Sequence, residues 1–90
     1  MLNVVFSNRF TKDLKRAAKR GYRIELLEKV VDHLAAKEPL DEKHRDHALK
    51  GKYEGYNECH ITSDWLLIYQ IVGDDLYLLL SRTGTHSDLF

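Results

Sequence analysis

The sequence predicts one α+β domain in which a pair of helices packs on a mostly antiparallel sheet of four strands. The chain has 90 residues, the size of a single domain, so residues 1–90 are treated as one unit. Two segments repeat apolar residues every three or four positions, as amphipathic helices do, at 8–20 and 23–37. Four shorter segments have strand-like composition between turn residues, at 2–6, 56–62, 65–72 and 76–81. The expected order is β-α-α-β-β-β.

The first strand and the first helix are separated by a capping signal. Val4, Val5 and Phe6 favour extended backbone, and Ser7 or Asn8 can accept a hydrogen bond from the first turn of the helix. The buried stripe of this helix is expected to consist of Phe10, Leu14 and Ala17 or Ala18. Gly21 suits the left-handed position that ends a helix, so a tight turn into the second helix follows.

The second helix is expected to bury one apolar stripe and to stop before Pro39. Its stripe consists of Ile24, Leu27, Val31 and Leu34. The short turn between the two helices predicts an antiparallel helical hairpin. The first strand must then pair with a later one, because the hairpin forms a crossover connection.

The second half of the chain is predicted to form a meander of strands. Residues 40–52 are polar and aperiodic and are interpreted as a loop that carries His44 and His47. The strand at 65–72 is apolar on both faces, so it is expected to be central. Turns are predicted at 63–64 and 73–75. After Ser81 the segment 82–86 is expected to leave the sheet and to end in a tail at 87–90.

Charge is distributed unevenly although the formal net charge is zero. Residues 1–52 hold 13 Lys or Arg against 8 Asp or Glu, whereas residues 53–90 hold 1 against 6. Within 9–23 a single acid, Asp13, accompanies Arg9, Lys12, Lys15, Arg16, Lys19, Arg20 and Arg23. This asymmetry fits either a basic face for nucleic acid or an acidic partner, or a solvated helix surface.

The chain is expected to be cytoplasmic and free of disulfides. No apolar stretch is long enough to cross a membrane, and the first residues lack the pattern of a secretion signal. Cys59 is the only cysteine, which suits a reducing compartment. We interpret it as a small buried hydrophobic residue, with a catalytic thiol as the alternative.

Polar side chains that could carry chemistry gather at predicted strand ends and loops. They form four groups: Asp46–His47, Glu58–Cys59–His60, Asp64, and Arg82 with His86. A rigid sheet holds such side chains in place at its rim. Histidine exchanges a proton near neutral pH, so three histidines at strand ends point to acid–base chemistry.

Cleavage of RNA without a metal requires a base for the 2′-hydroxyl, an acid for the leaving 5′-oxygen and a cation for the phosphate. His60 and His86 could divide the first two roles, with assistance from His47. Arg82 is the natural phosphate clamp, because no other Lys or Arg follows residue 52. Glu58 and Asp64 could orient a histidine.

Aromatic side chains could add stacking surfaces for bases, which RNA-binding proteins commonly use. Tyr53, Tyr56 and Phe90 lie in loop, strand-entry or tail contexts, whereas Trp65 and Tyr69 are expected to pack the sheet.

A metal site is the competing use of the same side chains, since His60, His86, Asp64 and Glu58 offer nitrogen and oxygen ligands. They form no tight ligand motif such as His-Glu-x-x-His, so we predict neither a metal nor a cofactor. A serine hydrolase has less support still, because Ser81 and Ser87 lack a nucleophile-elbow motif.

Four motifs together resemble the YafQ branch of the RelE/ParE superfamily of toxins. They are Asp46-His-Ala-Leu-Lys-Gly51, Gly55-Tyr-Asn-Glu-Cys-His60, Asp64-Trp-Leu-Leu-Ile-Tyr69 and Arg82-Thr-Gly-Thr-His-Ser-Asp-Leu-Phe90. The resemblance covers nearly the whole chain and includes the start of the first helix, from Phe10 to Lys15.

The resemblance implies a RelE-like fold and a ribosome-dependent mRNA endonuclease that works in the ribosomal A site through attack of the 2′-hydroxyl. It also implies a cognate antitoxin, through which the pair would bind operator DNA and repress its operon. Carried over by position, the functional residues are His47, His60, Asp64, His86 and Phe90.

RNA contacts are expected from Arg82, Phe90 and Glu58 and from Lys50 and Lys52. Ribosome binding would then use the basic face from Arg9 to Arg23 together with Lys43 and Arg45. The alternative function is a binding module of the same fold that has lost catalysis and acts through its antitoxin or another protein target.

Overall fold

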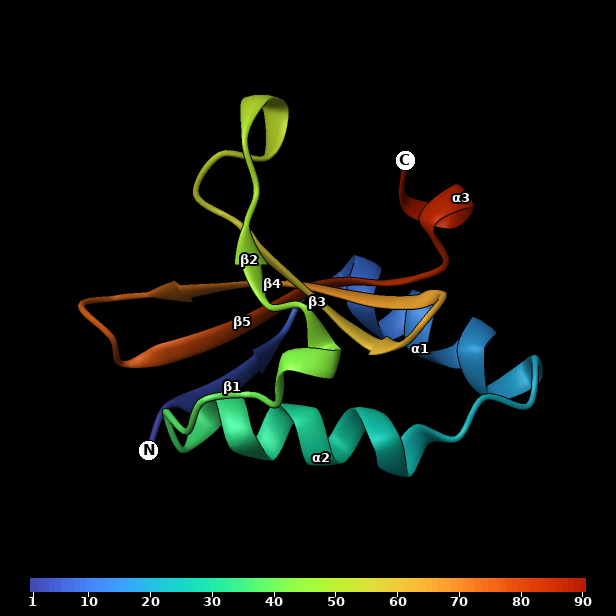
Figure 1. The fold of residues 1–90 in the computed structure, drawn as a ribbon, viewed down its shortest axis with the longest axis horizontal. Helices are drawn as coiled ribbons and strands as arrows, with labels where there is room; N and C mark the ends of the chain where they lie inside the picture. The colour runs from blue at the N-terminus through green and yellow to red at the C-terminus, as the bar shows by residue number, and fades with distance from the viewer.

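A five-stranded sheet forms the centre of the molecule, with two long helices packed against it (Figure 1). The computed structural model describes all residues from Met1 to Phe90. The strands are β1 (Asn3–Phe6), β2 (His47–Ala48), β3 (Asn57–Thr62), β4 (Trp65–Val72) and β5 (Tyr77–Gly84). The helices are α1 (Asn8–Lys19), α2 (Ile24–Ala35) and α3 (His86–Leu89), with short 3₁₀ turns η1 (Glu42–His44) and η2 (Gly51–Tyr53).

The sheet has the order β1-β5-β4-β3-β2, and only β1 and β5 pair in parallel. The helical pair and the strands β2, β3 and β4 lie between these two strands in the chain, and the first strand pairs with a later one, as the sequence predicted. β4 lies in the middle of the sheet, where Leu66, Leu67 and Ile68 are all nearly inaccessible to solvent. An α+β fold with a mostly antiparallel sheet is therefore confirmed.

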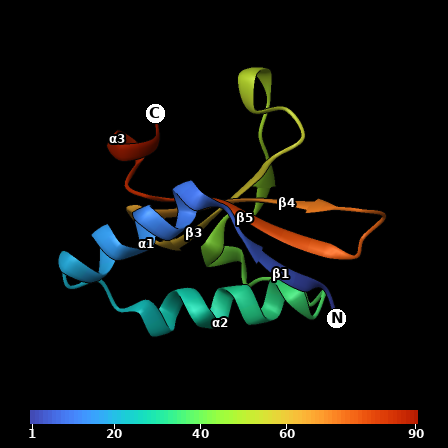
Figure 2. The same ribbon diagram turned by 180° about the vertical axis from the view of Figure 1, so that it is seen from behind.

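The main core lies between the sheet and the two long helices. Phe10 and Ala17 of α1 and Leu27 of α2 join Leu67 of β4 and Leu78 of β5 in one buried cluster. The side chain of Ser7 accepts a hydrogen bond from the Phe10 amide and caps α1, as predicted. The view from behind shows α2 running along the side of the sheet on which this core lies (Figure 2).

Three expectations about the sheet and the tail were wrong. The segment 40–52 is not only a loop, because His47 and Ala48 pair with Glu58 and Asn57 and add a fifth strand. The segment 82–86 does not leave the sheet at once, since β5 continues to Gly84 opposite Leu66. The tail at 87–90 largely belongs to α3, which a capping box at Thr85 stabilises.

The face of the sheet opposite the two long helices is open at its centre. Figure 1 shows the β2–η2 segment and α3 standing above this face on either side. We call it the open face. Leu66, Ile68 and Leu89 form a small second apolar cluster on it, so α3 is anchored to β4.

Removing a central side chain of β4 is expected to unfold a large fraction of the protein. Leu67 is completely buried, and Leu67→Ala should lower the free energy of unfolding by about 2–5 kcal/mol. Urea denaturation followed by circular dichroism measures this change. The matched control is Leu76→Ala in the β4–β5 turn, where leucine is 57% exposed and the loss should be below about 0.5 kcal/mol. Equal losses would contradict this view of the core.

Candidate active site

Glu58 and His60 of β3 project onto the open face. They alternate with Cys59, which belongs to the core on the helix side. Glu58 lies opposite Ile68, and His60 lies opposite Leu66, the two β4 residues of the open-face cluster. Residues directly opposite in an antiparallel pair share a face, so this alternation places the carboxylate and the imidazole beside α3.

Glu58 lies between two imidazoles. Its Oε1 is 3.5 Å from Nε2 of His47 on β2 and 3.9 Å from Nε2 of His60. The Glu58 side chain is only 10% exposed, whereas His47 is 49% and His60 is 19% exposed. The buried carboxylate can therefore hold both rings while each ring keeps an edge toward solvent.

Backbone carbonyls fix the orientation of both rings. Nδ1 of His47 donates to the Arg45 carbonyl at 2.6 Å, and Nδ1 of His60 lies 3.4 Å from the Ser63 carbonyl. A carbonyl only accepts, so the bond at His47 requires a proton on Nδ1. In the neutral ring, Nε2 then carries the lone pair that can accept a proton, and Nε2 is the nitrogen that faces Glu58.

The third histidine reaches the open face from α3. His86 is exposed, and its ring lies 5.0 Å from that of Phe90, centroid to centroid. Phe90 in turn contacts Tyr53 at 5.3 Å, and Tyr53 contacts Tyr56 at 6.3 Å. We call these four rings the aromatic wall. It joins α3 to η2 and the start of β3, across the open face.

Asp88 holds α3 to the body of the protein. It completes the capping box with Thr85 and receives two hydrogen bonds from Arg20, at 2.7 and 3.2 Å. These hydrogen bonds keep the pKa of the Asp88 carboxyl well below its usual range, with Arg20 as the largest cause. The short helix that carries His86 is thus oriented by a residue at the end of α1.

Arg82 reaches the open face because of a β-bulge. Ile68 pairs with Arg82 whereas Tyr69 pairs with Leu80, so Ser81 is an extra residue in β5. Such a bulge reverses which face the following side chains use. Thr83 accordingly turns to the core, where its hydroxyl accepts from the Trp65 indole at 2.8 Å and donates to the Leu66 carbonyl. Arg82 borders a cavity on the other face.

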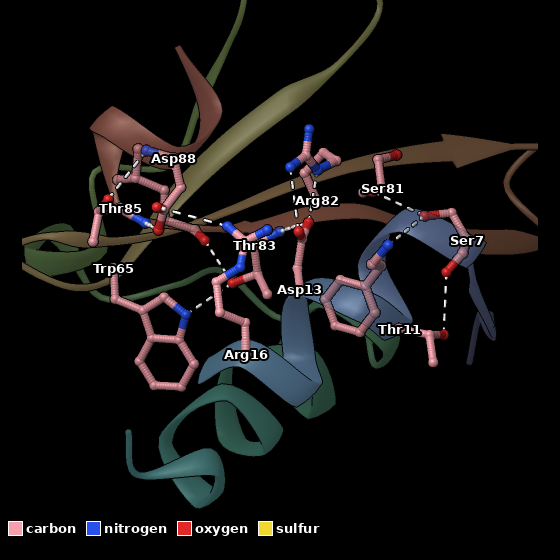
Figure 3. A network of polar contacts seen from close by, with 12 residues as sticks. Ser7, Thr11, Asp13, Arg16, Trp65, Ser81, Arg82, Thr83, Thr85 and Asp88 are labelled. Atoms are coloured by element: carbon pink, nitrogen blue, oxygen red, sulfur yellow. Dashed lines mark hydrogen bonds and ion pairs between the residues drawn. The ribbon is translucent and has the colours of Figure 1, made fainter. Parts of the chain in front are cut away.

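Asp13 fixes the Arg82 guanidinium from the side of the sheet (Figure 3). Its carboxylate is 4% exposed and accepts from Nε of Arg82 at 2.6 Å, from Nη2 at 3.2 Å and from the Thr83 amide at 3.2 Å. The hydrogen bonds that Arg82 donates to Asp13 raise the pKa of the Arg82 guanidinium above its usual value. Nη1 is not used in these bonds and remains available to another anion.

The other predicted residues take different positions. Asp64 is exposed in the β3–β4 turn, beside a cavity that also contacts Tyr22 and Arg23, and it makes no hydrogen bond or ion pair with the histidines. Lys50 is exposed between β2 and η2. Lys52 lies in η2 and borders the same cavity as Arg82. The structure thus brings His47, Glu58 and His60 into contact, and joins His86 to Phe90.

Asp13 was missed as a site residue by the sequence analysis, although one signal could have revealed it. It is the only acid among the cations of α1, and its spacing from Phe10 and Ala17 places it on the buried stripe. A carboxylate in that position requires a partner, because burial of an unpaired charge is strongly unfavourable. Asp46, whose carboxylate accepts from the Tyr69 hydroxyl at 2.5 Å, likewise secures the segment before His47.

Cys59 takes no part in this arrangement. Cys59 is fully buried, and burial raises the pKa of its thiol far above the usual value, so the catalytic-thiol interpretation has no support. No group of three or more His, Cys, Asp or Glu side chains is arranged to hold a metal ion.

No helix has the length and apolar character needed to span a bilayer.

Comparison with known proteins places the chain in the class of bacterial toxins of type II toxin–antitoxin systems. A family model described as "Bacterial toxin of type II toxin-antitoxin system, YafQ" matches residues 2–90. The chain therefore belongs to the YafQ family, as its motifs indicated. The mRNA interferase toxin YafQ of Escherichia coli K12 is 36% identical over 89 residues, which cover 98% of this chain and 95% of the relative.

Solved structures agree with this assignment. A metal-bound toxin from Helicobacter pylori is 47% identical with a TM-score of 0.94, and each chain is covered completely. YafQ in the E. coli DinJ–YafQ toxin–antitoxin complex is 36% identical with a TM-score of 0.89, covering 99% of this chain and 97% of that one. The RelE-like fold expected from the resemblance is thereby confirmed.

Loss of the Asp13 carboxylate should destabilise the protein. Asp13→Ala leaves the buried Thr83 amide and the Arg82 guanidinium without their acceptor, so the free energy of unfolding should fall by about 2–4 kcal/mol. Urea denaturation measures it. Asp32→Ala, which removes an exposed carboxylate from α2, should change it by less than about 0.5 kcal/mol. A loss no larger than that of the control would show that Asp13 does not have this role.

The stability that Asp88 provides should depend on pH. Its folded-state pKa lies below the unfolded value of about 3.9, so the contribution is present above pH ~4 and is lost as the pH falls toward the lowered pKa. The difference in melting temperature between wild type and Asp88→Asn should therefore be largest near neutral pH and should shrink in acid. Asp74→Asn in the exposed β4–β5 turn serves as the control. A difference independent of pH would contradict the assignment.

Proposed function

We propose that this chain is a ribosome-dependent mRNA endonuclease and the toxin of a type II toxin–antitoxin pair. The observation that carries the proposal is the histidine set on the open face: His47 and His60 share Glu58, and His86 stands on α3 above the same face. This arrangement provides the proton-transfer groups that metal-independent RNA cleavage requires, and Arg82 adds a cation for the RNA backbone on the same face.

In the proposed reaction one histidine takes the proton from the ribose 2′-hydroxyl, whose oxygen then attacks the adjacent phosphorus. The bond from phosphorus to the 5′-oxygen breaks, and a second histidine protonates that leaving oxygen. The products are a 2′,3′-cyclic phosphate and a free 5′-hydroxyl. His60 and His86 are the proposed pair, and His47 supports them through Glu58, which contacts both rings of the β2–β3 edge.

Substrate positioning is assigned to Arg82 and to the aromatic wall. Arg82 can present Nη1 to a phosphate while Asp13 holds its other nitrogens. Phe90 is half exposed beside His86, so a base can stack on it next to the proposed acid or base. Asp64 stays a candidate at the β3–β4 turn, where it would act on substrate and not on the histidines.

The proposed partners are a cognate antitoxin, the ribosomal A site and mRNA, with operator DNA bound only through the antitoxin. The E. coli relative in complex with DinJ supports the antitoxin. The exposed cations of α1 and of the segment before β2, such as Lys12, Lys15, Lys43 and Arg45, support binding to ribosomal RNA.

Each proposed acid–base histidine should be required for cleavage. His60→Ala and His86→Ala are expected to lower the rate of mRNA cleavage on translating ribosomes by about 10²–10⁴. Primer extension of the mRNA after timed incubation measures the rate, and circular dichroism verifies folding. His33→Ala is the matched control, since His33 lies on α2 with its ring 54% exposed and away from the open face.

If the wild type leaves mRNA intact but binds an antitoxin tightly, the chain is a binding module and not a nuclease. If the wild type cleaves and His60→Ala and His86→Ala cleave equally well, the nuclease assignment survives but these histidines are not its acid and base.

A further inference from the structure

The Ser81 bulge leaves a cavity of about 300 Å³ on the open face, on the far side of Ile68 from Glu58. Three cations border it: Arg9 at the start of α1, Lys52 of η2 and Arg82 of β5. No carboxylate borders it. A concave site with cations and without acids is suited to an anion.

Two tyrosines give the cavity an aromatic side. Tyr53 and Tyr56 border it and also belong to the aromatic wall that ends at Phe90 and His86. The cavity is therefore continuous with the surface on which we place the substrate. Cations beside aromatic rings are the combination that binds single-stranded RNA through its phosphates and bases.

An unpaired hydroxyl lies at the same place. Oγ of Ser81 is buried and has no hydrogen-bond partner, although Ser81 borders the cavity. Buried polar groups are nearly always paired, so an orphaned hydroxyl indicates a partner that the protein itself does not supply. A phosphate oxygen or a ribose hydroxyl would satisfy it.

Arg9 is not explained by the stability of its helix. It occupies the first turn of α1, where a positive charge opposes the helix dipole, and it forms no ion pair. Binding of an external anion gives this cation a use that the isolated fold does not.

The cavity and the proposed point of cleavage lie two strands apart on the open face. Glu58, Ile68 and Arg82 are register partners on three neighbouring strands, so Arg82 stands about 10 Å from Glu58 along the row. An RNA strand that is cut at the histidines must continue beyond them. We propose that the Ser81 cavity is a subsite for a nucleotide that flanks the cleaved one, with its phosphate bound by Arg9, Lys52 and Arg82.

This inference rests on the proposed function but can be tested without cleavage. The probe is a hexaribonucleotide with 2′-O-methyl sugars, which cannot supply the attacking hydroxyl, and a series in which each linkage in turn is a neutral methylphosphonate. Fluorescence anisotropy gives the dissociation constant. One neutral linkage and Arg9→Ala should each weaken binding roughly three- to tenfold. Combined, they should weaken it no more than either alone, because both remove the same contact.

Salt dependence and Ser81→Ala provide further readouts. Arg9→Ala should reduce the slope of log K against log salt by about 0.7, the value for one phosphate contact on a single strand. Ser81→Ala removes only the unpaired hydroxyl, so it should weaken binding without lowering the melting temperature. Lys29→Ala is the control on the exposed surface of α2, on the other side of the sheet, and its effect should multiply with that of every neutral linkage.

If the effects of Arg9→Ala and of the neutral linkage on the dissociation constant multiply at every position, the subsite proposal is wrong. That result would leave the nuclease proposal intact if His60→Ala and His86→Ala still abolish cleavage. Conversely, coupling at one linkage in a protein that does not cleave mRNA would retain the subsite as an RNA-binding feature and reject the nuclease.

Discussion

The buried carboxylate of Asp13 is the interaction on which the architecture around the site depends. β1 ends at Phe6 opposite Leu80, so the outer edge of β5 has no strand beside it from Ser81 onward. Asp13 takes the place of the absent strand by accepting the Thr83 amide, and the same oxygens orient Arg82. One side chain thus closes a sheet edge, attaches α1 and directs a cation to the open face. Each of these would change if the carboxylate were absent.

Periodicity predicted the long elements well because their burial is one-sided and extends over several turns or residues. The stripe of α1 around Phe10 and the apolar run of β4 around Leu67 are examples, and these two side chains are completely buried. The short elements escaped prediction for a physical reason. β2 consists of His47 and Ala48, both exposed, so its pairing with β3 leaves no hydrophobic pattern in the sequence.

The end of β5 shows a second limit of sequence patterns. Strict alternation in β5 would place Leu78, Leu80 and Arg82 on one face, and the strand was predicted to end at Ser81. The bulge shifts the alternation by one residue, so that Thr83 enters the core and Arg82 does not. The candidate residues His47, His60 and His86 were identifiable from residue type and from the family motifs. Glu58 was also predicted to orient a histidine, but its contact with two rings and the role of Asp13 became visible only in the three-dimensional structure.

The central location of Cys59 has a consequence for measuring motions of this protein. The thiol is inaccessible on β3 and burial disfavours its thiolate, so reagents such as iodoacetamide can modify it only when the sheet separates from α1 and α2. With one cysteine in the chain, the alkylation rate reports a single structural opening. The alkylation rate of the native protein therefore measures how often this structure opens, and the measurement needs no added label and no engineered residue.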